Sequence, residues 1–262
     1  MLEKKSETVF SGERIPERKR IYLLDEIRGL AVVAMVLYHM LYSAGEVFGY
    51  EAVHNIFISV MSFEPIIPVT FIFISGICTR LSRSNLKRGC ILFIVALAVN
   101  IVTWVFVPQI VIRFGVINLL SVSMILYGLF EKGIKRINCM VGFFLSLFLF
   151  ALTWGVSRHY VGLLNFELFE LPEVLYRSDF LFPIGFRNAR FFSSDYFPLL
   201  PWLFMFLSGS FFWGAVKDKK LPDTLYKMHF KPLSSVGRYA AVIYIVHQPM
   251  IFAVLYAIEY LR

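Results

Sequence analysis

The first long apolar run of the chain carries three residues whose types could support acid–base chemistry. Asp25, Arg28 and His39 lie in the stretch LDEIRGLAVVAMVLYHM. His39 follows Arg28 by eleven residues, which is about three turns of an α-helix, so both side chains share one face, and Asp25 lies within about 60° of Arg28. His39 is then about 16 Å along the axis from Arg28, about half the depth of a bilayer core.

A histidine at that depth has two interpretations. Ionisable groups inside a membrane are costly and normally face the bundle interior or a wet cavity. Because imidazole exchanges a proton near pH 7, His39 would act as a general base in a polar passage. The alternative is a hydrogen bond between helices that only orders the bundle. For Asp25 and Arg28, the alternative to a functional role is an ion pair that fixes the helix end.

The composition indicates an integral membrane protein. Of the 262 residues, 58% are hydrophobic and 17% are charged, and the mean hydropathy is +0.69. A soluble domain has about 45–50% apolar and about 25% charged residues. Apolar runs of about 18 residues recur along the chain, which is the length that a bilayer core demands. So many long runs cannot all be buried in the core of one soluble domain.

We predict a single domain, 1–262, that is an all-α, polytopic membrane bundle of about seven transmembrane helices. The expected spans lie near residues 28–47, 55–79, 89–108, 114–130, 138–156, 197–216 and 236–258. Segment 1–22 is polar and basic and is expected to be a cytoplasmic lead-in. The protein is expected in the cell membrane as a multi-pass protein.

The distribution of positive charge predicts the orientation. If the N-terminus is cytoplasmic, 20 of the 26 Lys and Arg residues fall on the cytoplasmic side, as the positive-inside rule requires. The same bias accounts for the net charge of +8 without nucleic acid as a partner.

One predicted extracytoplasmic loop, residues 157–195, is much longer than the others. It is rich in aromatic residues and mixed in charge. Its phenylalanines argue against disorder, so we expect part of it to lie on the outer leaflet or to cap the bundle. Pro198 and Pro201 open the next span, and Asp195 is expected to cap that helix.

A short basic loop follows the second predicted span. CTRLSRSNLKRG contains Arg80, Arg83, Lys87 and Arg88. Arginine binds phosphate through two parallel hydrogen bonds and lysine as a point charge. The alternative is a topology signal that also contacts anionic lipid. Ser75, with the neighbouring glycine in FISG, marks a place where helices, or a slender ligand, approach closely.

Further polar residues interrupt the apolar runs. Tyr244, His247 and Gln248 lie in the last span, where Pro249 frees a backbone carbonyl, and a structural hydrogen bond is the alternative to a catalytic role for His247. Glu64 either opens a helix ahead of Pro65 or binds substrate. Asn118 is a polar group near the start of the fourth span.

The cysteines carry no metal signal. Cys78, Cys90 and Cys139 have neither a metal-binding nor a disulfide-framework spacing, and we interpret them as packing residues.

These residues carry a resemblance to known families. The first span contains an Arg and a His separated by ten residues, and the basic loop after the second span contains the pair Arg80–Arg83. Both patterns resemble those of the acyltransferase-3 family. The blocks LLDEIRGLAVVAMVLYH, FIFISGICTRLSRSNLKRG, RFGVINLLSVSMIL, YFPLLPWLFMFLSGSFFWG and LSSVGRYAAVIYIVHQPM are similar, in order, to those of bacterial relatives of heparan-α-glucosaminide N-acetyltransferase. Together they cover roughly a third of the chain.

The resemblance implies an activity and its participants. An acetyl or other acyl group would pass from cytoplasmic acetyl-CoA, through the bundle, to an extracytoplasmic sugar or amino sugar. No metal is implied, the surrounding membrane lipid is a partner, and an oligomer is possible. The site residues implied in this way fall into three groups. His39, His247 and Asp25 would be catalytic; Arg28, Ser75, Arg80, Arg83, Lys87 and Arg88 would bind CoA; Glu64, Asn118, Tyr244 and Gln248 would bind the acceptor.

Three alternatives stay open. His54, towards the outer side, is a rival for the catalytic base. A transporter would use the polar mid-span residues as a substrate or proton path, although matching halves are not visible in the sequence. A non-catalytic membrane scaffold that retains the fold is the third.

Overall fold

The computed structural model describes residues 20–261, and most of these residues lie in helices. The helices are α1 Tyr22–Tyr42, α2 Glu51–Val60, α3 Ile66–Leu81, α4 Asn85–Phe106, α5 Val116–Ile134, α6 Cys139–Leu152, α7 Leu199–Val216, α8 Lys231–Arg238 and α9 Ala240–Tyr260, and the strands are β1 Tyr160–Leu163 and β2 Phe166–Glu170. A π-helical turn, Ser43–Val47, extends α1. All but the last few residues of the predicted lead-in 1–22 lie outside the described residues.

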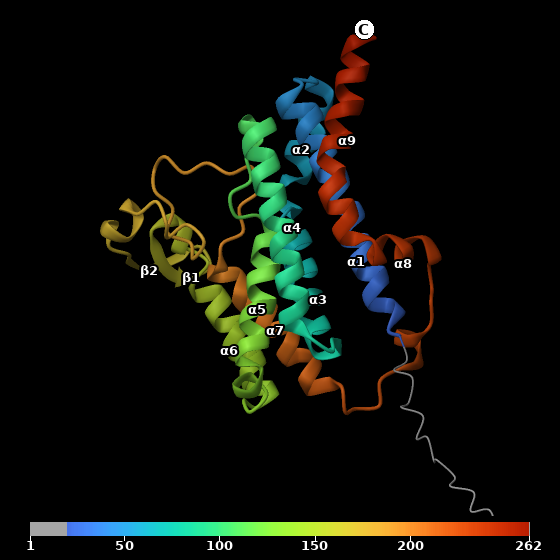
Figure 1. The fold of residues 1–262 in the computed structure, drawn as a ribbon, viewed down its shortest axis with the longest axis vertical. Coiled ribbons are helices and arrows are strands. Elements are labelled where there is room, and N and C mark those ends of the chain that lie inside the picture. The colour runs from blue at the N-terminus through green and yellow to red at the C-terminus, as the bar shows by residue number, and fades with distance from the viewer. Residues whose placement is uncertain (1–19, 262) are drawn as a thin grey trace, which may run out of the picture.

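The prediction of an all-α, polytopic membrane bundle is confirmed. Six described helices are long and apolar enough to cross a membrane, and α2 with α3 forms a bent pair that would make a seventh span. Figure 1 shows that the basic segments connect helix ends at one end of the molecule. These are ends of α1, α3, α4, α5, α6 and α7. The chain finishes at the opposite end.

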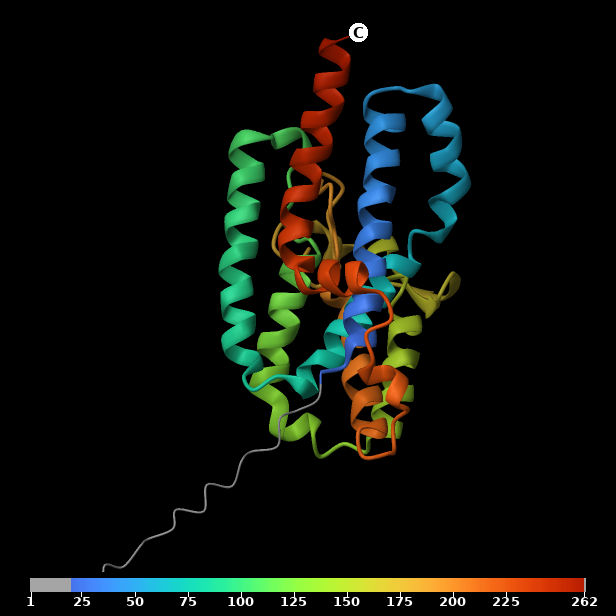
Figure 2. The ribbon, with the colours of Figure 1, turned by 90° about the vertical axis from the view of Figure 1, so that its right-hand side faces the viewer.

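Two predicted spans have different boundaries in the structure. The span expected near 55–79 is broken between α2 and α3, which meet at an angle of 46°. Pro65 stands at the break, where it lacks an N–H and its ring crowds the preceding turn, so α2 cannot continue. The span expected from residue 236 starts at Ala240, because α8 is a separate, polar helix that lies across α1 (Figure 2).

The helices form two groups joined through α1 and α3. Helices α3 to α7 enclose the largest apolar core, in which Ile72, Leu119 and Phe206 are fully buried. Helices α1, α8 and α9 form the second group, beside the first (Figure 1). A polar site between the two groups would therefore draw side chains from helices far apart in the sequence.

Small residues set the closest helix crossings. A Cβ atom on Gly29 would lie 2.0 Å from the carbonyl oxygen of Leu233 on α8, and one on Gly237 would lie 1.9 Å from that of Asp25 on α1. Gly76 on α3 and Gly209 on α7 make the same reciprocal contact. Backbones approach this closely in membrane bundles where side chains are absent, so these glycines fix the position of α8 on α1 and of α7 on α3.

The long loop 157–195 is ordered, as its phenylalanines predicted. It contains the antiparallel hairpin β1–β2 and a 3-10 turn, Glu173–Arg177. Strand β1 lies beside α6. The last residues of the loop return to the connection between α4 and α5, where Phe114 and Tyr196 form a bridge.

The glycine crossing of α1 and α8 gives a stability prediction. Gly237→Ala should lower the thermal unfolding temperature in detergent by several degrees. Overpacking costs about 1–3 kcal/mol, and each kcal/mol corresponds to about 2–4 °C in a chain of this size. The matched control is Gly133→Ala, because a Cβ there meets no atom within 4 Å. Equal unfolding temperatures for the two variants would contradict the close crossing.

Candidate active site

Two histidines from opposite ends of the chain face each other between α1 and α9. The ring centres of His39 and His247 are 5.0 Å apart, and His247 is 8% exposed. The inward face predicted for His39 is thus the face that contacts α9. The edge of the Tyr38 ring also lies against His39, with 5.9 Å between ring centres.

The hydrogen bonding of His247 determines which of its nitrogens carries the proton. Nδ1 lies 2.6 Å from the backbone carbonyl oxygen of Tyr244. A carbonyl only accepts, so Nδ1 holds the hydrogen and Nε2 presents a lone pair in the neutral ring. Nε2 is buried and has no hydrogen-bond partner among residues 20–261. Buried polar atoms are rarely left without a partner, so this nitrogen is an acceptor available to a substrate or a water.

His39 is less constrained than His247. Its ring makes no hydrogen bond to any side chain or backbone group of the described segment, and the residue is half-buried. It is therefore free to accept a proton from a group that enters beside His247.

Asp195 joins the end of the long loop to this site. Its carboxylate accepts hydrogen bonds from the backbone N–H of Val116, at 3.1 Å, and from the hydroxyl of Tyr244. The loop is held there by a hydrogen bond from Phe197 N–H to the Phe114 carbonyl oxygen, 2.9 Å. Burial raises the pKa of the Asp195 carboxyl, and the bonds from Tyr244 and Val116 act in the opposite direction.

The structure also places three further residues expected at an acceptor site. Asn118 accepts a hydrogen bond from Gly115 N–H at 3.2 Å and, with Tyr244, lines a cavity of about 10 Å³, room for about one water. Gln248 donates to the Ser43 hydroxyl at 3.1 Å, while its Oε1 is buried without a partner in the described chain. Glu64 lies at the break between α2 and α3, close enough to Asp195 for the two carboxyl groups to interact electrostatically.

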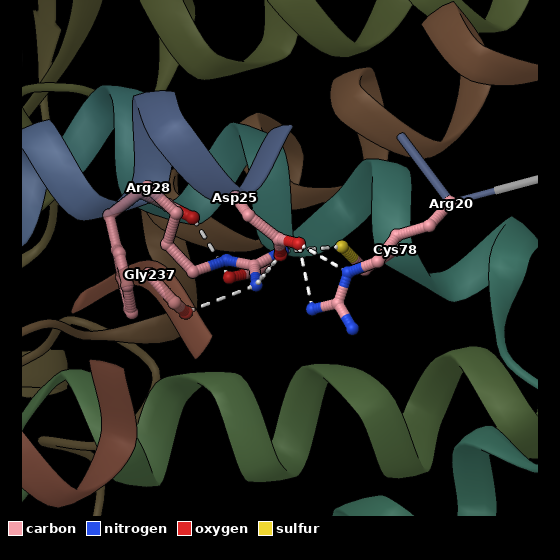
Figure 3. A network of polar contacts seen from close by, with 7 residues as sticks. Arg20, Asp25, Arg28, Cys78 and Gly237 are labelled. Carbon is pink, nitrogen blue, oxygen red and sulfur yellow. Dashed lines mark hydrogen bonds and ion pairs between the residues drawn. The ribbon is translucent and has the colours of Figure 1, made fainter. Parts of the chain in front are cut away.

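Asp25 and Arg28 form a separate polar network at the start of α1 (Figure 3). Asp25 accepts from Arg20 at 2.7 Å and from Arg28 at 3.3 Å. Arg28 also donates to the sulfur of Cys78 on α3, 2.9 Å, and to the Gly237 carbonyl oxygen, 3.4 Å. The network ties α1 to α3 and α8, and it lies apart from the histidine pair.

Glu26, next to Asp25, holds the start of α8. Its carboxylate accepts from the backbone N–H groups of His229, 2.6 Å, and Phe230, 2.9 Å, and lies 3.1 Å from the His229 ring nitrogen. Sequence reasoning assigned no role to Glu26 or His229. The signal available was a second acid at the edge of a membrane span, where an acid without a partner is costly.

The predicted phosphate-binding residues of the basic loop comprise one half-buried and three exposed side chains. Arg80 donates to the Ser210 hydroxyl at 3.2 Å, and its Nη2 is buried with no partner within residues 20–261. Arg83, Lys87 and Arg88 are exposed around the start of α4. Ser75 is buried and donates to the Phe71 carbonyl oxygen at 2.8 Å, so its hydroxyl is already satisfied within α3.

Comparison with known families identifies the chain. The family model described as heparan-alpha-glucosaminide N-acetyltransferase, catalytic, matches residues 20–249. The chain belongs to this family. No curated protein and no solved structure matches it.

Membership of the acetyltransferase family makes this chain a multi-pass membrane transferase, and it confirms the resemblance read from the sequence. The match begins at the Asp25–Arg28 network and ends beyond His247, so both polar clusters lie inside it. Within the described part of the chain, no three His, Cys, Asp or Glu side chains are grouped so that they could hold a metal ion.

The structure also shows where two other residues considered in the sequence analysis, Asp195 and His54, lie. Asp195 does not cap α7, whose N-cap position is Pro198; it caps α5 instead, because the loop returns to Val116. The rival base His54 lies on α2, where its Nδ1 is 2.9 Å from Glu46, and it contacts neither His39 nor His247.

The link between Asp195 and Tyr244 gives a second prediction. Asp195→Ala and Tyr244→Phe should each lower the unfolding temperature, and the double variant should lower it by less than the sum. Groups that share a hydrogen bond have coupling energies of about 0.5–3 kcal/mol. Tyr244→Phe combined with Tyr160→Phe is the control pair and should be additive. Additive effects for Asp195 and Tyr244 would show that the two side chains act independently.

Proposed function

We propose that this protein transfers an acetyl group from acetyl-CoA to an amine or hydroxyl of a saccharide. Membership of the acetyltransferase family supports the reaction class. The observation that carries the proposal is the histidine pair, in which the Nε2 of His247, without a partner in the described part of the chain, lies beside a second imidazole.

The proposed orientation places the basic end of the bundle in the cytoplasm of the cell. Arg80, Arg83, Lys87 and Arg88 lie at that end, as do the connections that follow α5 and α7. The positive-inside rule assigns such an end to the cytoplasm. Acetyl-CoA would approach from this side, and the acceptor from the side where the chain ends.

The donor site would use the basic residues around the end of α3 and the start of α4. CoA carries a pyrophosphate and a 3′-phosphate, which Arg83, Lys87 and Arg88 would bind as exposed cations. The Nη2 amino group of Arg80 has no partner within residues 20–261 and would reach a phosphate or the pantetheine arm that passes Ser75. Arg28 adds charge nearby while Asp25 holds its guanidinium in place.

The proposed reaction requires a general base and a nucleophilic attack on the thioester carbonyl carbon. His39, our first choice for the base, removes a proton from the acceptor amine or hydroxyl. The acceptor nitrogen or oxygen then attacks the thioester carbonyl carbon, the C–S bond breaks, and the CoA thiolate leaves with a proton returned by the imidazolium. His247 would accept a hydrogen bond from the acceptor at Nε2. Glu64, Asn118, Tyr244 and Gln248 would bind acceptor hydroxyls.

Donor binding is tested by thermal unfolding in the presence of CoA. The purified protein should unfold at a higher temperature with millimolar CoA, because a ligand that binds only the folded state stabilises it. Arg80→Ala together with Arg83→Ala should remove most of that shift. Lys132→Ala, at the same basic end but on α5, is the control and should keep it. Absence of any shift at millimolar CoA would contradict donor binding.

The catalytic roles are tested by transfer from radiolabelled acetyl-CoA to glucosamine in proteoliposomes. His39→Ala should unfold at nearly the wild-type temperature and should lose about 10²–10⁴-fold in turnover, the usual contribution of a general base. His54→Ala is the matched control and should retain most activity. If His39→Ala keeps full turnover, the base is His247 or His54.

A further inference from the structure

The tip of the hairpin β1–β2 lies beside a membrane-spanning helix. The N–H of Leu164, between the strands, donates to the carbonyl oxygen of Ala151 on α6 at 2.8 Å. The candidate span that contains α6 runs from Cys139 to Arg158. Ala151 is twelve residues after Cys139, about 18 Å along the helix, so it falls within a hydrocarbon core of about 30 Å.

The arrangement of the whole bundle gives the same depth. Helix α4 is 22 residues long and is exposed along its length through Ile94, Ile101 and Trp104, so it marks the thickness of the bilayer core. Both views show the hairpin at the level of α4, well short of the end of the molecule at which α2 and α9 reach furthest (Figures 1 and 2).

The side chains of the tip are apolar and uncovered. Leu163, Leu164 and Phe166 are 45%, 49% and 69% exposed. They adjoin the exposed face of α6, where Phe144 and Phe148 are 61% and 52% exposed. The tip thus continues a helix surface that lipid covers, and that continuity distinguishes it from an isolated apolar patch.

Several polar groups of the tip have partners within the protein. Besides the Leu164 N–H, the Leu164 carbonyl oxygen accepts from the Tyr160 hydroxyl at 2.9 Å. The side-chain oxygen of Asn165 accepts from Arg158 at 3.2 Å. A backbone in lipid needs such internal partners because no water is available to supply them.

We infer that the hairpin tip, residues 163–166, is a membrane anchor seated in the lipid of the leaflet next to the C-terminal end of α6. A surface pocket beside the tip is lined by the charged side chains of Arg158, Glu167 and Glu170. The same loop ends at Asp195, whose carboxylate accepts a hydrogen bond from the Tyr244 hydroxyl.

The test measures collisions of a nitroxide with molecular oxygen and with a water-soluble nickel chelate. The full chain, with Cys78, Cys90 and Cys139 replaced by Ala, carries one label in vesicles of phosphatidylcholine and phosphatidylglycerol. Phe166→Cys should resemble Phe148→Cys on α6, with oxygen contact exceeding nickel contact. Asp218→Cys, in the connection after α7, is the water-exposed control and should show the reverse.

Two results would overturn the inference. A label at position 166 that behaves like the one at 218 would place the tip in water. A label shielded from both reagents, with spin–spin broadening, would place it against a second copy of the chain. Should the cysteine-free chain fail to fold, Phe166→Asp in the native chain should lower the unfolding temperature in vesicles more than Phe166→Leu; equal temperatures would also contradict lipid contact.

Discussion

The crossing of α1 and α8 is the constraint on which the rest of the site depends. Gly29 and Gly237 bring the two backbones into contact, Glu26 holds the N–H groups at the start of α8, and Arg28 reaches the Gly237 carbonyl. Helix α9 begins three residues after Gly237. The crossing therefore sets the level at which α9 runs beside α1, and with it the level at which His247 meets His39.

Three of the buried polar atoms that have no partner among residues 20–261 belong to residues proposed to bind substrates. A buried polar atom without a hydrogen-bond partner is destabilising. The buried side chains of Asp25, Glu26 and Asn118 all have hydrogen-bond partners. His247 Nε2 and Gln248 Oε1, beside His39, do not, and neither does Arg80 Nη2 at the basic end. Side-chain atoms of Asn100, Ser123 and Tyr127 in the described chain are also buried without a partner, so the unsatisfied groups support the proposed donor and acceptor sites only together with the histidine pair and the basic end.

Sequence patterns predicted what depends on helical periodicity. The number of spans follows from the apolar runs, and the structure has six, or seven if α2 and α3 form one bent span. The shared face of Arg28 and His39 is a prediction from the 3.6-residue repeat. Features that depend on contacts between distant segments were not visible. Asp195 meets Val116 across 79 residues of chain, and Glu26 meets His229 across 203. Sequence reasoning placed one span near 55–79 and also offered a helix start at Glu64 ahead of Pro65; the structure has α3 begin at Ile66, directly after Pro65.

The most direct test of the account is a structure of the protein with a non-transferable acetyl-CoA analogue. The account predicts the acyl carbon beside the rings of His39 and His247, with the phosphates of CoA on Arg80, Arg83, Lys87 and Arg88. An analogue whose acyl carbon lies beside His54 and Glu46, or whose phosphates bind away from the basic end, would contradict it.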